Sequence, residues 1–162
     1  MSGVRFILRR LFDALRGIDM LIWSLIFIRA FGMGPFSGIL AIGVTDTGTL
    51  GKLFSEAIEN IDKKEMEGVK STGANKLQQN RFGIFPQILP VFISQTLYYL
   101  ESNTRGAIVV GAMGAGGIGL QFLGALQTGK DWENVAYISF LVLLMVVLID
   151  VISAKLRRKL IG

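Results

Sequence analysis

Four polar side chains in one otherwise apolar stretch are the residues of this chain best suited to bind a solute. Glu101, Asn103 and Arg105 lie close together, and Tyr98 precedes Glu101 by about one helical turn. A guanidinium can bind two oxygens of a small oxyanion at once, and an amide and a phenol can add hydrogen bonds. We therefore predict that Arg105, with Asn103, Tyr98 and Glu101, lines a path for an anion.

Two alternatives weigh against this interpretation. Residues 101 and 105 are one helical turn apart, so Glu101 and Arg105 could neutralise each other inside the apolar stretch. Asp46, which is flanked by Thr45 and Thr47, is a further candidate for the path, and a role in helix packing is equally compatible with its position.

Several chemistries are excluded by residue types that the chain lacks. It contains no cysteine and no histidine, which removes thiol catalysis, the usual zinc sites and a Ser-His hydrolase. Gly114, Gly116 and Gly119 spell the dinucleotide-binding pattern, but that pattern requires a short strand before it, and here a membrane-length apolar stretch precedes it. We expect these glycines, with Gly117, to allow sharp turns in an external loop.

The elements that carry these residues are predicted from blocks of apolar residues. Hydrophobic residues make up 51% of the chain and the mean hydropathy is +0.53. The clearest block lies just before the C-terminus, and Asp150 is its one ionisable residue. Two other blocks are separated by a Gly-Met-Gly-Pro turn, and the long central span begins at Pro86. We predict an all-α membrane protein with four spans, at about residues 5–31, 36–54, 86–113 and 135–153.

The positions of the cations predict the orientation of these spans. Most basic residues fall in three groups: Arg5, Arg9, Arg10 and Arg16; Lys52, Lys63, Lys64, Lys70, Lys76 and Arg81; and Lys155, Arg157, Arg158 and Lys159. The positive-inside rule places all three groups in the cytoplasm. Both termini and the loop of residues 55–85 are then cytoplasmic, and the glycine-rich loop of residues 114–134 is external. A nucleic-acid-binding patch would not need apolar spans between its cations.

The cytoplasmic loop carries a spaced motif. Glu67 is followed by Gly73, with Ala74 beside it, and then by Pro86, and this spacing resembles the EAA signature of ABC-importer permeases. The resemblance implies two short helices hinged at Gly73 that dock onto a separate ATP-binding subunit. The alternative is a solvated loop between two spans.

The sequence departs from that signature at four positions. Gly68 and Val69 replace the paired alanines, and Gly83 and Phe85 stand where an aliphatic residue and a leucine are usual.

Residues 15–41, 51–62 and 97–119 resemble one branch, the phosphonate-type permeases. The resemblance implies the core of a type I ABC importer permease in the cell inner membrane, passed through several times and surrounded by lipid. It implies a permease homodimer, a cytoplasmic ATP-binding subunit that holds ATP and magnesium, and a periplasmic or lipoprotein solute-binding protein. This chain would hold no cofactor, metal or catalytic residue of its own. Its substrates would be phosphonates or related phosphorus oxyanions such as phosphite.

The resemblance also predicts a single permease domain over residues 1–162 that lacks an N-terminal part, because the match begins at the second helix of such permeases. Two rival functions stay open. The chain could serve another small solute, such as methionine or a different anion. It could also be an inactive truncated membrane fragment or scaffold.

Overall fold

The computed structural model describes residues 2–129 and 131–161, and that part of the chain consists of helices joined by short turns. Two of the segments, η1 and η2, are π-helical. The elements are α1 (Ser2–Gly17), α2 (Met20–Phe31), α3 (Pro35–Glu59), α4 (Lys63–Ser71), α5 (Lys76–Gln79), η1 (Asn80–Ile84), α6 (Phe85–Val110), η2 (Gly111–Ala115), α7 (Gly117–Thr128) and α8 (Trp132–Ile161).

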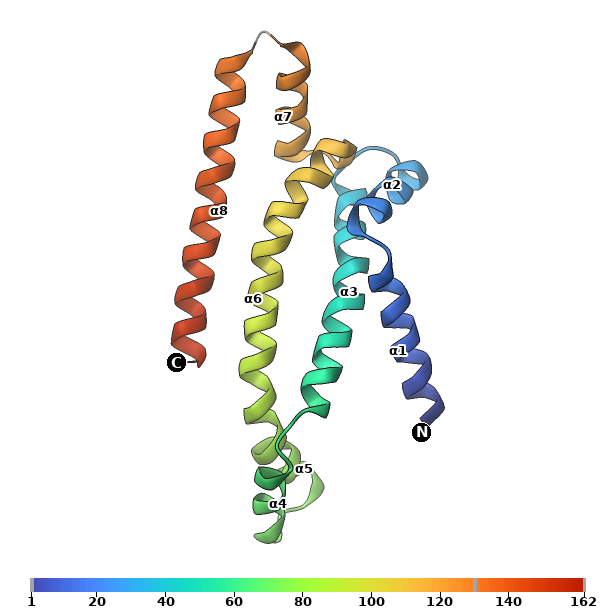
Figure 1. Cartoon of the computed structure of the whole chain (residues 1–162), viewed down its shortest axis with the longest axis vertical. Helices are drawn as coiled ribbons and strands as arrows, with labels where there is room; N and C mark the ends of the chain where they lie inside the picture. Colours follow the sequence, from blue (N-terminus) through green and yellow to red (C-terminus); the bar gives the residue numbers. More distant parts are fainter. Residues whose placement is uncertain (1, 130, 162) are drawn as a thin grey trace.

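The long helices α3, α6 and α8 run along the molecule, with α6 between the other two (Figure 1). Helix α1 lies beside α3. Helices α4 and α5 extend beyond one end of the long helices, and α2 and α7 lie toward the other end. Both chain termini lie nearer to the end that carries α4 and α5 than to the end that carries α2 and α7 (Figure 1). Which end faces the cytoplasm stays a prediction from the cations.

Local residue choice explains where several helices begin. The Asp19 carboxylate accepts a hydrogen bond from the Leu21 N–H at the start of α2, and the Asp62 carboxylate caps α4 in the same way. Pro35 occupies the first turn of α3, directly after Gly32 and Gly34, whose φ angles of +90° and +153° favour glycine. The turn predicted between the first two apolar blocks is therefore present.

Small residues let α1 approach α3 closely. A Cβ atom on Gly48 would lie 2.8 Å from the Leu15 Cβ, and one on Gly51 would lie 2.8 Å from the Phe12 ring. The same two helices are joined by ion pairs, because the Lys52 ammonium lies 2.9 Å from the Asp13 carboxylate and Arg9 contacts Glu59. Close approach through glycine is typical of helix packing in membranes.

Large apolar side chains are exposed, whereas the most deeply buried ones are small or polar. Ala41, Val110, Ser24, Ser37 and Ser153 are at most 1% exposed, and exposed apolar residues run along α8 from Tyr137 to Leu156. Such an inverted pattern fits helices whose outer surface contacts lipid. Within the described residues, Trp132–Lys159 alone is long and apolar enough to cross a membrane. The helices Lys76–Ala115 and Gly117–Thr128, bent by 62°, meet that standard together.

Some boundaries differ from the expected ones. Residues 5–31, expected as one span, form α1 and α2, because Asp19 starts a new helix. Helix α3 continues to Glu59, so the first residues of the expected loop 55–85 are helical. The expected loop 114–134 holds the 12-residue helix α7.

Candidate functional site

Helices α4 and α5 form a hairpin that protrudes from the ends of the long helices (Figure 1). We call residues 60–84 the central hairpin. Glu67 is exposed on α4, and Pro86 lies in the first turn of α6. Gly73 lies between α4 and α5 with a φ of +81°, which a side chain rarely adopts, and Ala74 beside it is half-buried. The residues with the signature spacing therefore lie at the turn and base of one exposed hairpin.

Local hydrogen bonds define the hairpin. The Gly73 N–H donates to the Lys70 carbonyl at 3.0 Å, which closes the end of α4. At the start of α5 the Asn75 carboxamide accepts from the Gln78 N–H, and the Gln78 side chain accepts from the Asn75 N–H, each at 2.9 Å. This reciprocal pair is a capping box, which satisfies donors that a helix N-terminus leaves open. The turn at Gly73 is thus set by the hairpin's own sequence.

The hairpin presents a hollow with apolar and polar walls. The hollow has a volume of about 600 Å³ and is lined by Gly68, Val69, Thr72, Gly73, Ala74, Gln78 and Phe82. Leu77 and Phe82 are 78% and 62% exposed. Clustered exposed apolar side chains on a polar surface mark sites where another protein binds.

Gly83 explains one departure from the permease signature. It is buried under α4, and a Cβ atom there would lie 3.2 Å from the Met66 Cα. The backbone of α4 therefore occupies the space that the usual aliphatic side chain would need. Gly68, by contrast, has no atom within 4 Å of such a Cβ, so glycine is not required there by packing.

The ionisable residues of α6 pair with α8. The Glu101 carboxylate lies 3.3 Å from the Arg157 guanidinium, and the Arg105 guanidinium lies 3.6 Å from the Asp150 carboxylate. The alternative in which Glu101 and Arg105 neutralise each other is therefore not the arrangement adopted. Asp150 and Arg157 are separated by about two helical turns, so both face α6.

Asn103 lies on the opposite side of α6 and donates a hydrogen bond to the Asp46 carboxylate on α3. Tyr98 is 57% exposed, and its ring meets the Tyr99 ring edge-on with 5.4 Å between centroids. The structure thus distributes the predicted path residues over two faces of α6. One face carries Tyr98, Glu101 and Arg105, and the other carries Asn103.

The glycine-rich turn joins α6 to α7 by close backbone contact. Gly114, Gly116 and Gly117 have φ angles of +120°, +85° and +69°. A Cβ atom on Gly119 would lie 2.0 Å from the Ile108 carbonyl oxygen, so only glycine fits there. The Gly114 carbonyl accepts a hydrogen bond from the Gly34 N–H at 3.1 Å, which attaches this turn to the one between α2 and α3.

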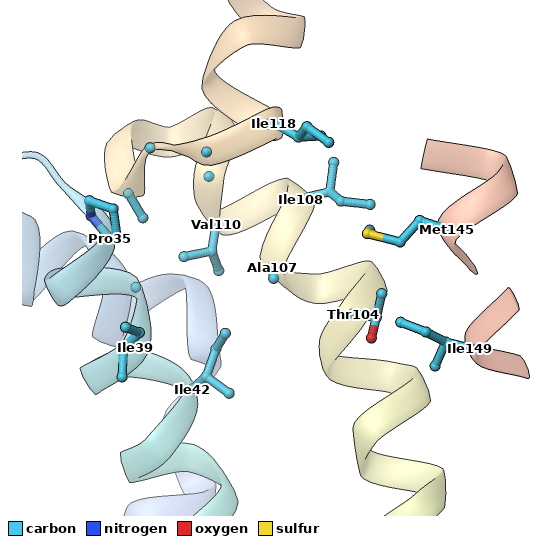
Figure 2. A pocket seen from close by; sticks show the side chains of 16 residues that line it. Pro35, Ile39, Ile42, Thr104, Ala107, Ile108, Val110, Ile118, Met145 and Ile149 are labelled. Atoms are coloured by element: carbon cyan, nitrogen blue, oxygen red, sulfur yellow. The ribbon is translucent and has the colours of Figure 1, made fainter. Parts of the chain in front are cut away.

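A hollow of about 450 Å³ lies below this turn, between α3, α6, α7 and α8 (Figure 2). Its labelled side chains are apolar apart from Thr104, whose hydroxyl donates to the Leu100 carbonyl at 2.8 Å. Ile39 and Ile42 approach it from α3, and Met145 and Ile149 from α8 (Figure 2). An apolar hollow of this kind suits packing against a lipid tail or a helix and not the binding of an anion.

Sequence reasoning missed Gln87 and Arg157, which the structure places at these sites, and left Asp150 without a named partner. Gln87 contacts the base of the hairpin, and Asp150 and Arg157 are the partners of the α6 charges. A lone carboxylate in an apolar span indicates a partner on another helix, so Asp150 could have been linked to Arg105. Nothing in the sequence singles out Gln87.

Long helices with exposed apolar surfaces and a protruding hairpin that carries the permease-like spacing are consistent with a membrane subunit of a transporter. The chain belongs to the family described as "Binding-protein-dependent transport system inner membrane component", which matches residues 2–161.

Several members of this family have sequences similar to that of this chain. The chain is 39% identical over 150 residues to the phosphite transport system permease protein PtxC of Stutzerimonas stutzeri, an alignment that covers 93% of this chain and 54% of the relative. It is 42% identical over 120 residues to the putative cryptic phosphonate transport system permease protein PhnE2 of Escherichia coli K12, covering 74% of this chain and 98% of the relative. The chain spans about half the length of the phosphite relative.

Solved structures share the fold. The MetNI methionine ABC transporter in inward-facing conformations superposes with a TM-score of 0.80 at 20% identity, covering 98% of this chain and 76% of that one. An amino acid ABC transporter superposes with a TM-score of 0.79 at 16% identity, covering 99% and 78%. The expected all-α, type I importer permease fold is confirmed.

Proposed function

We propose that this chain is a multi-pass permease subunit in the cell inner membrane that imports a phosphorus oxyanion, phosphonate or phosphite, with energy from a separate ATP-binding subunit. The observation that carries the proposal is the exposed central hairpin, with Glu67, Gly73 and Pro86 at the signature spacing. The hairpin docks in a groove of the ATP-binding subunit, with Gly73 and Ala74 at the contact.

Nucleotide chemistry takes place on the partner. ATP and magnesium bind the ATP-binding subunit, and its closure moves the hairpin and through it α3 and α6. A permease homodimer with a solute-binding protein on the external side, periplasmic or lipid-anchored, completes the transporter. The glycine-rich turn from Gly114 to Gly119 lies at the end of α6 far from the hairpin, and α7 continues beyond it to the end of the molecule (Figure 1). The solute-binding protein delivers substrate on this side.

The substrate class is supported by the relatives named for phosphite and phosphonate and by one cation at membrane depth. The Arg105 side chain is 54% exposed although it faces Asp150, so its guanidinium has room to bind a second anion. Methionine is the second candidate. It is favoured by a 25% identical match over 124 residues to the probable D-methionine transport system permease protein MetI of Pasteurella multocida.

Two matched glycine substitutions test the docking role. Gly73→Ala places a side chain at a φ of +81°, whereas Gly68→Ala meets nothing within 4 Å. A left-handed conformation costs a non-glycine residue about 1–2 kcal/mol, so we expect ATP-dependent phosphite uptake by proteoliposomes to fall roughly tenfold for Gly73→Ala only.

The ATP-binding subunit should also co-purify less well with Gly73→Ala than with Gly68→Ala. Equal uptake and equal association for the two variants would show that the hairpin is not the docking element. Uptake of methionine and not of phosphite by the unmodified complex would establish the second candidate.

A further inference from the structure

The base of the central hairpin is held to α6 by one side chain, Gln87. The Asp62 N–H donates to the Gln87 Oε1 at 2.8 Å. The Gln87 Nε2 donates in turn to the Asp62 carbonyl at 3.3 Å and to the Gly83 carbonyl at 2.7 Å. A single carboxamide thus binds both backbone groups of Asp62 and one carbonyl of η1.

The two hydrogen bonds to Asp62 connect segments 25 residues apart along the chain, and the third is a local bond to Gly83, four residues before Gln87. Asp62 is the N-cap of α4 and follows the last turn of α3, whereas Gly83 belongs to η1 at the other end of the hairpin. Gln87 itself lies in the first turns of α6. The chain leaves α3, passes through the hairpin and returns to α6, and the Gln87 carboxamide joins the two ends of the hairpin.

Apolar contacts between the same elements lie to either side of Gln87, and Asn103 bonds Asp46 farther along α6. The Phe54 and Phe92 rings stack with 4.1 Å between centroids and join α3 to α6 farther from the hairpin. On the hairpin side, α4 lies against Gly83 through the Met66 backbone. Gln87 is the polar link between these two contacts, and hydrogen bonds fix direction more strictly than apolar contacts do.

We propose that Gln87 is a positioning residue that fixes both ends of the central hairpin to α6, so that a displacement of the hairpin moves α3 and α6 together. This inference rests on the proposed function, since it assigns the route by which movement caused by the ATP-binding subunit reaches the membrane helices. We call these hydrogen bonds of Gln87 the clamp. Without the clamp, the hairpin would rotate about its connections to α3 and α6 and the two helices would not move with it.

Glutamine, glutamate and methionine have side chains of similar length, so substitutions among them at position 87 test the hydrogen bonds of the clamp. The carboxamide of Gln87 accepts one hydrogen bond and donates two. Gln87→Glu keeps the acceptor for the Asp62 N–H but sets a carboxylate oxygen against the Asp62 and Gly83 carbonyls, and Gln87→Met loses all three hydrogen bonds. Gln95→Met is the matched control, because Gln95 lies on α6 and lines the same hollow of about 340 Å³ between α3 and α6 as Gln87.

Spin-label distances test the clamp without any partner. The chain has no cysteine, so cysteines placed at the exposed positions Lys70 and Thr96 would be its sole labelling sites. In lipid nanodiscs we expect one narrow distance distribution for the unmodified chain and for Gln95→Met. The distribution should be broader in both Gln87→Glu and Gln87→Met. An unchanged distribution in Gln87→Met would overturn the clamp.

Transport by the assembled complex tests transmission. We expect the phosphite imported per ATP hydrolysed to fall about tenfold for Gln87→Met, a factor that corresponds to roughly 1.4 kcal/mol, with the ATP-binding subunit still bound. Gln87→Glu should lower the same ratio, because its carboxylate repels the Asp62 and Gly83 carbonyls.

An unchanged ratio of import to hydrolysis in Gln87→Met would overturn the transmission role. An unmodified complex that hydrolyses ATP without importing phosphite would instead refute the proposed substrate, and the spin-label distances would still judge the clamp.

Discussion

Replacing Gly119 by alanine should destabilise the α6–α7 turn far more than the removal of one hydrogen atom suggests. The new Cβ would lie 2.0 Å from the Ile108 carbonyl oxygen and 2.7 Å from the Ala112 nitrogen. Carbon and carbonyl oxygen normally approach no closer than about 3.3 Å, so α7 would have to move away by more than 1 Å. Neither of these atoms can rotate aside, because both belong to the backbone.

The cost follows from what the shift would disturb. Forcing an extra methyl group into a tight contact costs about 1–3 kcal/mol, and 1 kcal/mol lowers the midpoint of thermal unfolding by roughly 2–4 °C in a chain of this size. We therefore expect Gly119→Ala to lower the midpoint by about 2–12 °C. Gly124→Ala is the control on the same helix, because a Cβ there meets nothing within 4 Å.

Alanine favours a helix over glycine by about 1 kcal/mol, so Gly124→Ala should leave the midpoint unchanged or raise it. The measurement is thermal unfolding of the purified chain in detergent, followed by size-exclusion chromatography after heating. If Gly119→Ala and Gly124→Ala gave the same midpoint, the close approach of α7 to α6 would be refuted.

Two predictions concern the charges of α6. Glu101→Arg and Arg157→Glu should each lower the yield of folded protein, and the double variant that carries both changes should recover it, because 3.3 Å separates the two groups. Two single variants that fold as well as the double variant would contradict the pairing. Arg105→Gln should raise the phosphite concentration for half-maximal uptake about tenfold, since a charged, two-point contact is lost, and Arg29→Gln near the end of α2 should not. Equal half-saturation in the two glutamine variants would remove Arg105 from the path.

The sequence predicted the hairpin well because its determinants are local. The resemblance to the permease signature implied two short helices hinged at Gly73, and their capping groups lie within a few residues of the backbone they satisfy. The turn before Pro35 was predictable for the same reason, because glycine and proline constrain their own backbone.

Contacts between distant segments were not predictable from one sequence. Asp150 has partners of suitable charge on several helices, and only the packing of α8 against α6 selects Arg105. Helix α7 was missed because its glycines suggest a loop. Their actual role is to allow contact with α6, and the tertiary contact outweighs the weak helix propensity of Gly119.

The bond between Gly34 and Gly114 has a mechanical consequence for α6. It attaches the α2–α3 turn to η2, which directly follows α6, so the end of α6 far from the hairpin acts as a fulcrum. Helix α6 has 26 residues and is therefore about 39 Å long. Tilting such a rod by roughly 5° about that end sweeps the hairpin end through about 3 Å. A small rotation of α6 about the fulcrum therefore displaces the hairpin by several ångströms.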